Sequence, residues 1–321
     1  MAPRLVTIFG GSGFLGRHLV RRLAASGARV TVGVRNPDRA LFLQPMGDVG
    51  QITPVAANVR DEASVIAAVE GADAVVNLVG ILYETRRQTF AQIHAQGAER
   101  VAQAARSAGA KRLVQVSAIG ADPHSVSAYA RSKAAGETAV KAAFPEATIM
   151  RPSILFGPED DFFNRFAALA RLFPVLPLFG GGATKFQPVY VGDVADAIVK
   201  ALEDGEAQGK TFELGGPKVY SFQELMALML AEIGRKRLLL KLPFFLADLM
   251  GAVLERLPRL PGKGPPLTRD QARLLRYDNV VSKDAPGLTE LGIAPTACEI
   301  ILSTYLDRFR RSGRFGGTRP G

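Results

Sequence analysis

Tryptophan is absent from this 321-residue chain, cysteine occurs once and histidine three times. With Cys298 as the single cysteine, no intramolecular disulfide can form and no cysteine-based metal site can be assembled, which suits a reducing compartment. The histidines His18, His94 and His124 are too scattered to form a metal site together. We therefore expect no metal cofactor.

Long uninterrupted apolar runs are also missing. The most apolar stretch covers 238–254, and Lys241, Pro243 and Asp248 interrupt it. A helix that spans a bilayer needs roughly 20 nearly unbroken apolar residues, so we expect no transmembrane segment. A buried strand is expected at 4–10, which leaves no room for a signal or transit peptide before it.

Short β-branched runs alternate with longer helical patterns over the first half of the chain. Strands are expected at 4–10, 28–35, 52–59, 72–80, 112–120 and 147–153. Several of them are almost continuously apolar, as when helices cover both faces of a sheet. Strands that alternate with helices of this length indicate βαβ units. The predicted fold class is α/β, a Rossmann-type doubly wound parallel sheet with a smaller, mostly helical C-terminal domain.

The pattern changes after Gly157, where proline and glycine become frequent. We expect a nucleotide-binding domain over 1–157, to which 186–215 returns. The smaller domain is then formed by 158–185 and 216–321. Within it, 257–266 is expected to be a linker and 310–321 a disordered basic tail.

A glycine-rich turn follows the first expected strand. In "GGSGFLGRHL", Gly10, Gly13 and Gly16 stand three apart, and Gly11, Gly13 and Gly16 satisfy G-x-G-x-x-G. Glycines let the backbone turn tightly and approach a pyrophosphate, and the N-terminus of the following helix directs unpaired N–H groups at it. Because a strand precedes the turn and a helix follows it, the motif predicts a dinucleotide site.

The end of the second expected strand bears on which dinucleotide binds. An NAD site places an acidic residue there, whereas an NADP site needs a cation for the 2′-phosphate. The sequence has Arg35 and no acid at this point, which favours NADP(H). The alternative is that Arg35 is a solvated surface residue. Asn58, at the end of the third strand, is a candidate adenine contact, and Gly80 leaves space for the ribose.

Three further residues complete a chemical pattern. Ser117 ends the fifth expected strand, and Tyr129 and Lys133 lie one helical turn apart on the helix that follows. With the glycine turn, this combination resembles the Ser and Tyr-x-x-x-Lys site of the short-chain dehydrogenase/reductase superfamily. The resemblance implies that the tyrosine is the acid or base, with a pKa lowered by the ammonium and by oxidised nicotinamide. It also implies that the lysine binds the nicotinamide ribose and that the serine orients a carbonyl.

A closer resemblance covers nearly the whole chain. The stretches "GGSGFLGRHLV", "LQPMGDVGQ" (43–51), "YARSKAAGE", "AFPEATIMRPSILFGPEDDFFNRFA" and "QPVYVGDVADAIV" are similar to the NADPH-binding accessory subunits of respiratory complex I, which are atypical extended short-chain reductases. The stretch "PMGDVGQ" distinguishes these subunits from generic members of the superfamily, which lack it. The resemblance implies a tightly held NADPH with a mainly structural role, other complex I subunits as partners, and a peripheral location on the cytoplasmic side of a bacterial inner membrane. Whether the chain turns over a substrate of its own stays open.

The same resemblance gives a full set of expected contacts. The residues expected to bind NADPH are Gly10, Ser12, Gly13, Phe14, Leu15, Gly16, Arg35, Asn58, Val59, Leu78, Val79, Gly80, Tyr129, Lys133, Pro152 and Ile154. Tyr129, Lys133 and Ser117 form the catalytic set, which can equally serve cofactor binding alone. The rival function is a free-standing NADPH-dependent reductase or epimerase that acts on a hydrophobic, quinone- or isoprenoid-related substrate.

Two polar features allow more than one interpretation. Extended reductases usually carry N-x-x-G after the fourth strand, with the asparagine in a proton relay; here "HAQG" puts His94 in its place and retains Gly97. His94 either relays protons or is a partly buried polar residue, and we favour the second interpretation. The carboxylates of "PEDD" (158–161) suggest acid–base chemistry or a cap for the next helix, and we favour the cap.

The net charge of +10 is concentrated toward the C-terminus, where 231–321 carry 16 basic and 9 acidic side chains. A basic surface suits anionic lipid, nucleic acid or an acidic protein, or simply belongs to a soluble protein of high isoelectric point. Because no nucleic-acid motif accompanies it, we expect no nucleic acid partner. The segment 235–260 joins cations to a proline-broken apolar stretch, which suits a membrane surface; alternatively, 238–257 closes the core of the smaller domain.

Overall fold

The computed structural model describes residues 4–256, 265–311 and 313. Most of the expected linker (257–264) and of the expected tail (312 and 314–321) lies outside the described residues. The expectation of a disordered tail from residue 310 is wrong for Arg310, whose guanidinium donates to the backbone oxygen of Glu232 at 2.9 Å and pairs with its carboxylate at 2.5 Å.

The chain forms two compact units. The first contains 1–152, 191–214 and 282–294, and the second contains 153–190, 215–281 and 295–321. The boundaries lie within a few residues of those expected near 157, 186 and 215. The segment 282–294, which we expected in the smaller domain, lies in the first unit.

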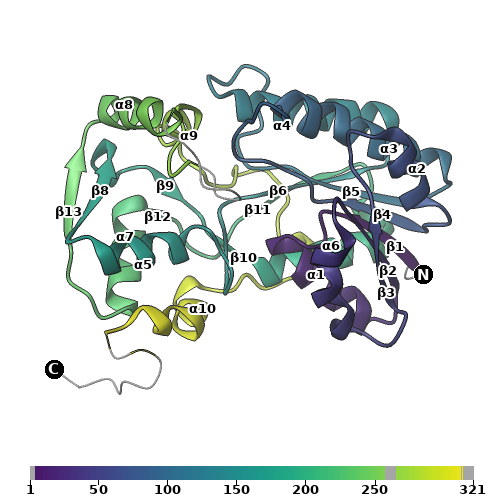
Figure 1. The fold of residues 1–321 in the computed structure, drawn as a ribbon, viewed down its shortest axis with the longest axis horizontal. Helices are drawn as coiled ribbons and strands as arrows, with labels where there is room; N and C mark the ends of the chain where they lie inside the picture. Colours follow the sequence, from purple (N-terminus) through teal and green to yellow (C-terminus); the bar gives the residue numbers. More distant parts are fainter. Residues whose placement is uncertain (1–3, 257–264, 312, 314–321) are drawn as a thin grey trace. The chain divides into compact units, whose positions relative to one another are not determined.

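A seven-stranded parallel sheet forms the centre of the first unit (Figure 1). Its strand order is β11-β6-β5-β4-β1-β2-β3. The bounds are β1 Leu5–Phe9, β2 Arg29–Val34, β3 Ile52–Ala56, β4 Ala74–Asn77, β5 Arg112–Val116, β6 Thr148–Pro152 and β11 Thr211–Leu214. All six strands expected over the first half are present, and the predicted doubly wound α/β fold is confirmed.

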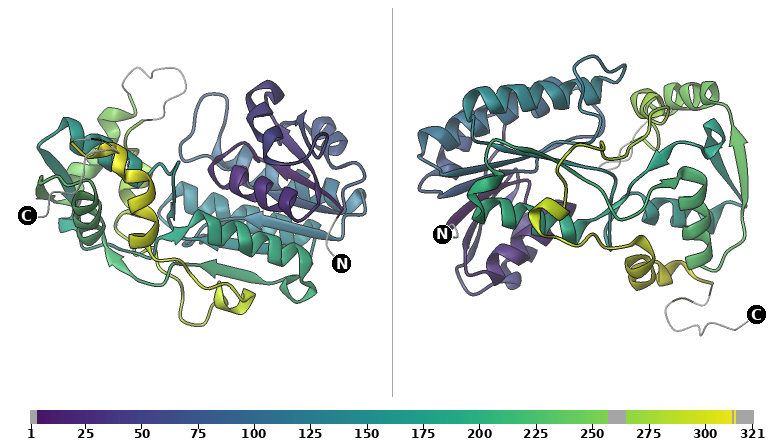
Figure 2. Two further views of the ribbon diagram at one scale, coloured as in Figure 1. Left: turned by 90° about the horizontal axis from the view of Figure 1, so that it is seen from below. Right: turned by 180° about the vertical axis from the view of Figure 1, so that it is seen from behind.

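Helices cover both faces of this sheet, as the further views also show (Figure 2). One layer holds α2 (Glu62–Val69), α3 (Gly97–Ser107) and α4 (Ala128–Ala143). The other holds α1 (Phe14–Ala25) and α6 (Val191–Glu203), which pack against each other. A 3₁₀ segment, η1 (Pro37–Met46), follows β2, and a π-helical turn, η2 (Ala91–Gln96), precedes α3.

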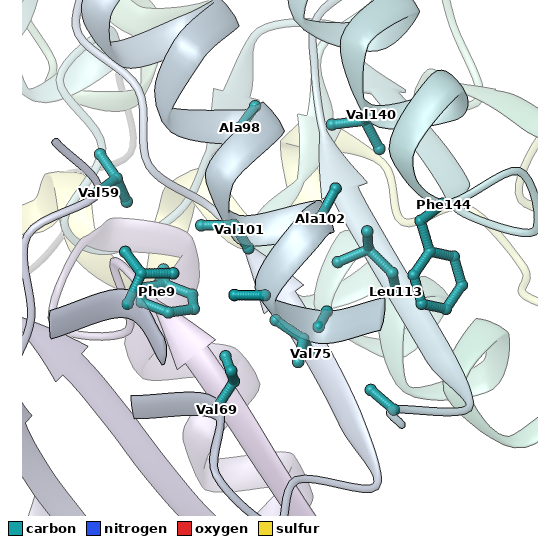
Figure 3. Packing of buried hydrophobic residues seen from close by; sticks show 14 of the residues in the cluster. Phe9, Val59, Val69, Val75, Ala98, Val101, Ala102, Leu113, Val140 and Phe144 are labelled. Carbon is teal, nitrogen blue, oxygen red and sulfur yellow. The ribbon is translucent and has the colours of Figure 1, made fainter. Parts of the chain in front are cut away.

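The core between the sheet and α2, α3 and α4 is built from small and medium apolar side chains (Figure 3). On α3, Ala98, Val101 and Ala102 are fully or almost fully buried and belong to this core. Their small volume lets the helix lie close to the strands, where Val75 and Leu113 fill the space beneath it.

The second unit is smaller and mainly helical, as predicted. Its helices are α5 Phe163–Leu172, α7 Phe222–Glu232, α8 Phe244–Leu254, α9 Arg269–Leu274 and α10 Cys298–Tyr305. Three two-stranded sheets accompany them: β10 (Val189–Tyr190) with β7 (Leu155–Phe156), β12 (Tyr220–Ser221) with β9 (Lys185–Phe186), and β13 (Leu238–Leu242) with β8 (Val175–Phe179). The apolar stretch that begins at residue 238 is therefore a strand first and a helix afterwards.

The carboxylate cluster that precedes α5 has a structural role at Asp160. Its carboxylate accepts hydrogen bonds from the backbone N–H of Gly157 at 3.2 Å and of Asn164 at 2.9 Å. The hydroxyl of Tyr305, on α10, also donates to it. The N-cap residue of α5, Phe162, makes no side-chain cap. Asp160, two residues earlier, performs the expected capping role by accepting from a first-turn N–H, and it also ties the start of α5 to α10.

Candidate functional site

The glycine turn joins β1 to α1, and its glycines are needed for different reasons. Gly10 has a φ of +81°, and a Cβ there would meet the backbone of Leu78 and Val79 at 3.3 Å. A Cβ on Gly16 would lie 2.5 Å from the backbone of Gly11. Gly13, by contrast, is exposed, and its Cβ would lie 3.2 Å from only one atom, the Gly10 oxygen. Gly10 and Gly16 thus serve the fold, whereas Gly13 leaves its outer side open for a ligand.

The N-terminus of α1 is available to an anion. No side chain caps it, and no acidic residue lies in its first turn. The first turn of a helix directs unpaired N–H groups and a partial positive charge outward. Ser12 and Phe14 are partly exposed at this end, and Leu15 is buried beneath it. The arrangement suits the pyrophosphate expected from the sequence.

Two arginines lie near the turn. Arg35 is exposed directly after β2, and no carboxylate within the described ranges pairs with it. Arg17, in the first turn of α1, donates from Nε to the Gly13 oxygen at 3.4 Å, and its Cζ lies 5.3 Å from the ring centre of Phe42 on η1. We had not singled out Arg17 in the sequence; its signal is a cation next to the last glycine of the motif.

The predicted adenine contact, Asn58, is engaged in its own turn. Its side-chain oxygen accepts from the backbone N–H and the Nε of Arg60, at 3.2 and 3.4 Å. Val59 is buried next to Gly97, where a Cβ would lie 2.9 Å from a Val59 methyl. Adenine contacts of Asn58 and Val59 stay a prediction.

The end of β4 meets the helix that carries the Tyr–Lys pair. Gly80 is exposed, and a Cβ on it would lie 3.3 Å from Lys133 Nζ and 3.7 Å from His94 Nε2. Leu78 and Val79 lie between Gly80 and β4, against the backbone of Gly10. The ends of β1 and β4 are thereby brought together with Lys133 at one edge of the sheet.

Lys133 and Tyr129 lie on the first turns of α4, whose N-cap Ser127 accepts from the Ala130 N–H at 3.2 Å. Lys133 is buried, donates to the Val116 oxygen at 3.4 Å, and lies 5.8 Å from the Tyr129 ring centre. Burial lowers the pKa of Lys133 to about 8 and raises the pKa of Tyr129 to about 12. The resemblance implies a lowered pKa for Tyr129, and Lys133 alone does not produce it.

Ser117, after β5, is buried, and its hydroxyl has no hydrogen-bond partner among the described residues. Beside it, Asn77 donates to Gln115 at 2.8 Å, and Gln115 donates to the Val116 oxygen at 3.0 Å. Lys133 thus shares an acceptor with a buried amide network. Sequence reasoning missed Asn77 and Gln115, although a polar residue at paired positions of two apolar strands was a usable signal.

His94, on η2, is 3% exposed and uses both ring nitrogens. Nε2 accepts from the backbone N–H of Ile81 at 2.9 Å, and Nδ1 lies 2.8 Å from the Ser132 hydroxyl. Burial, with the nearby charge of Lys133, lowers the pKa of His94 to about 3. These contacts support the interpretation as a buried polar residue over the proton relay.

Most of the predicted site residues belong to one unit. Pro152 ends β6 in the first unit, together with the glycine turn, Arg35, Asn58, Gly80 and the Ser117, Tyr129 and Lys133 set. Ile154 belongs to the second unit. The contact of either residue with a cofactor stays a prediction.

Known proteins share both the sequence and the fold. Residues 6–215 match the NAD dependent epimerase/dehydratase family. A protein of Arabidopsis thaliana, NADH dehydrogenase (ubiquinone) 1 alpha subcomplex subunit 9, mitochondrial, is 42% identical over 323 residues, which covers 98% of this chain and 80% of the relative. The protein of the same name from Mus musculus is 37% identical over 308 residues, with 95% and 80% covered.

Solved structures agree on the fold. An NADPH-dependent quinone oxidoreductase of Escherichia coli, solved with NADPH, superposes with a TM-score of 0.72 at 21% identity, over 93% of this chain and 99% of that one. At this identity the likeness concerns the fold alone. By its family match and its relatives, the chain is a member of the NAD dependent epimerase/dehydratase family, in the branch that holds these NADH dehydrogenase subunits.

Proposed function

We propose that the chain is an accessory subunit of respiratory complex I that holds NADPH as a mainly structural group. The observation that carries the proposal is the identity of 42% with an NADH dehydrogenase subunit along 98% of the chain. A likeness that extends through both units is expected of a protein that assembles in the same way, because assembly depends on surfaces outside the nucleotide site.

Three parts of the nucleotide have a matching group in the first unit. The open N-terminus of α1 and exposed Gly13 suit the pyrophosphate, and Arg35, with Arg17 beside the turn, suits the 2′-phosphate. Lys133 suits the nicotinamide ribose, next to Gly80. The buried hydroxyl of Ser117, which has no partner among the described residues, would be satisfied by a polar atom of a bound ligand, which supports binding at this place.

The same groups favour binding of NADPH over catalytic turnover. Bound NADPH supplies a hydride donor, but the chain must also supply a proton at the tyrosine. Burial raises the pKa of Tyr129 to about 12, which makes its hydroxyl a weak proton donor, while Lys133 already donates to a backbone oxygen. We infer that the pair mainly fixes the ribose.

The second unit carries a surface suited to a membrane or to an embedded partner. We call this the β13–α8 surface: the exposed apolar side chains are Leu238, Leu240, Phe245, Leu249, Met250 and Val253, and the exposed lysines are Lys236 and Lys241. Only Ala247 and Gly251 of α8 are buried, so this helix closes little of the core and presents apolar atoms outward.

Within the described segments, none of the helices has the length and apolarity to cross a bilayer. Independently of this, we propose that the β13–α8 surface attaches the protein peripherally, on the cytoplasmic side of a bacterial inner membrane. The relatives named above carry mitochondrial names. The exposed basic residues of this segment favour anionic headgroups, each basic residue contributing about 1 kcal/mol near the surface.

Purification of the native chain from its source membranes tests the proposal. We expect it to elute with the other complex I subunits, to release about one NADPH per chain on denaturation, and to oxidise no NADPH when offered quinones or other carbonyl compounds. A chain that elutes alone and oxidises NADPH with such a substrate is instead the free-standing reductase.

A further inference from the structure

His94 links three segments of the nucleotide-binding unit. It lies on the π-helical turn η2, its Nε2 accepts from Ile81 in the loop after β4, and its Nδ1 contacts Ser132 on α4. The π-helix is rare, appears mostly as a single turn within an α-helix, and is frequent at functional sites. One ring therefore spans the two elements that hold Gly80 and Lys133.

The direction of each hydrogen bond follows from the partners. A backbone N–H only donates, so Nε2 must carry no proton, and in the neutral ring the proton is then on Nδ1. Nδ1–H donates to the Ser132 oxygen, and the Ser132 hydroxyl donates to the backbone oxygen of Tyr129 at 2.7 Å. Every donor in this chain of bonds has an acceptor, which leaves no ring nitrogen for proton exchange.

Packing holds the ring in this orientation. Phe90 stacks on it with ring centres 5.3 Å apart, and Tyr129 meets it edge-on at 5.4 Å. The backbone of the same residue is fixed too, because a Cβ on Gly136 of α4 would lie 2.0 Å from the His94 oxygen. Because hydrogen bonds and packing fix the ring, a shift of α4 should also shift the loop after β4.

We propose that His94 is a positioning residue for the nucleotide site, a neutral strut that sets the spacing between the Gly80–Ile81 loop and the Tyr129–Lys133 helix. The inference rests on the proposed function insofar as it names NADPH as the ligand. It assigns to His94 no proton transfer and no contact with the nucleotide. The strut matters because Lys133 Nζ lies 3.3 Å from the position of a Cβ on Gly80, so a small shift of either element changes the space between them.

Substitutions can remove the two hydrogen bonds of the His94 ring one at a time, the bond to Ile81 or the bond to Ser132. In His94→Gln, the carboxamide reaches the position of Nε2 and can accept from Ile81, but Ser132 loses its donor. In His94→Asn, the shorter carboxamide reaches the position of Nδ1 and can donate to Ser132, but the Ile81 N–H is left unpaired. Ser132→Ala removes the hydrogen bond between His94 and α4 and keeps the imidazole.

The first measurement is NADPH affinity by fluorescence titration. We expect both His94 variants and Ser132→Ala to bind about tenfold more weakly, the cost of one misplaced polar contact. Ser132→Ala added to His94→Gln should weaken binding little further, since that link is already gone. The controls are His124→Gln, on an exposed loop, and Val101→Ala, a buried change on α3 that lowers stability without touching the His94 hydrogen bonds. If His94→Gln weakens binding no more than Val101→Ala does, His94 is a structural residue only.

The second measurement needs no nucleotide. Nitrogen-15 NMR should show His94 as the Nδ1–H tautomer, and the Ile81 amide should exchange with solvent faster in His94→Asn while that of Val114 in β5 is unchanged. An Nε2–H tautomer, or Ile81 exchange unaffected by His94→Asn, overturns the strut. If the unmodified chain binds no NADPH, the proposed function fails, and the strut is judged by these NMR results alone.

Discussion

Gly136 on α4 lies directly against the backbone of His94 on the π-helical turn η2. A Cβ on Gly136 would lie 2.0 Å from the His94 carbonyl oxygen, far inside van der Waals contact. In an exposed helix interior, replacing glycine by alanine stabilises by about 0.8–1 kcal/mol, because the unfolded chain loses freedom. Packing and propensity therefore act in opposite directions at this position.

Gly136→Ala should destabilise the protein in spite of the better propensity. We expect a loss of about 1–3 kcal/mol from overpacking, with weaker NADPH binding because α4 carries Lys133. Urea unfolding of the nucleotide-free protein gives the first value, and Ala135→Gly, an exposed neighbour on the same helix, calibrates the propensity. An unfolding free energy that rises in Gly136→Ala contradicts the contact.

Arg35 should decide between the two nicotinamide dinucleotides. It is exposed after β2, where an NAD site has an acid. The unmodified protein should bind NADPH more tightly than NADH, and Arg35→Asp should weaken NADPH binding roughly ten- to hundredfold, since a charge-assisted contact is lost. Arg39→Asp makes the same charge change on η1 and serves as the control. Equal affinities of the unmodified protein for both nucleotides exclude an NADP preference.

The places of the candidate site residues on strands, turns and helices were predictable from the sequence, because their signals are local. A glycine that must adopt positive φ, as Gly10 does, and a Tyr–Lys pair at helical spacing are both visible within a few residues. The links between elements were not predicted. The bonds from His94 to Ile81 and Ser132 join residues 13 and 38 positions apart, and only the packing of α4 on η2 brings them together.

In the second unit, too, local features were predictable and contacts between distant segments were not. Its helical character was predictable from composition, but the strand β13 was not, because "LLLKL" pairs with β8 more than 60 residues earlier in the chain. An apolar run of five residues fits a strand or a helix equally well, and only the partner decides. The cap at Asp160 was predicted because it is local, whereas its bond from Tyr305 was not.

Substitutions of Lys133 and Tyr129 should distinguish cofactor binding from catalysis. Lys133→Ala should lower NADPH retention and the melting temperature of the loaded protein together, whereas Tyr129→Phe keeps most of both, because its ring packing survives. A ligand at 100 times its dissociation constant adds about 2.7 kcal/mol, so loss of the cofactor is visible in a melting curve. Lys141→Ala, on the same helix and exposed, is the control. NADPH oxidation that Tyr129→Phe abolishes would make the pair catalytic.

His94 should make folding stability depend on acidity. Its pKa is about 3 in the folded protein against an ordinary value of 6.5, so folding favours the neutral ring. The contribution is complete above pH 6.5 and is lost as the pH falls toward 3. At pH 4.5, about 2–3 kcal/mol should be lost through this group. Urea unfolding at pH 7.5 and 4.5 should therefore show a smaller difference for His94→Gln than for the unmodified protein or His124→Gln. Equal differences in all three would mean that His94 titrates normally.

The β13–α8 surface should attach the protein to membranes through its exposed lysines. Lys236 and Lys241 are exposed, whereas Arg235 and Arg237 donate to the backbone oxygens of Phe309 and Ala170, at 3.0 and 2.7 Å. The arginines therefore have structural roles, and a test that changes all four cations would confuse docking with folding. The lysines alone can be changed without loss of a hydrogen bond within the described part of the chain.

Lys236→Ser with Lys241→Ser should release the protein from vesicles that contain anionic lipid at a lower salt concentration than the unmodified chain needs. Two basic residues near such a surface contribute about 2 kcal/mol, or roughly thirtyfold in affinity, screened over about 8–10 Å at ordinary salt. Lys200→Ser with Lys210→Ser removes the same charge from exposed positions of the first unit and should leave binding almost unchanged. Leu249→Ser, on the outward face of α8, should weaken binding at every salt concentration, because the apolar contribution is not screened. If the two lysine pairs behave alike, net charge and not this surface holds the protein to the membrane.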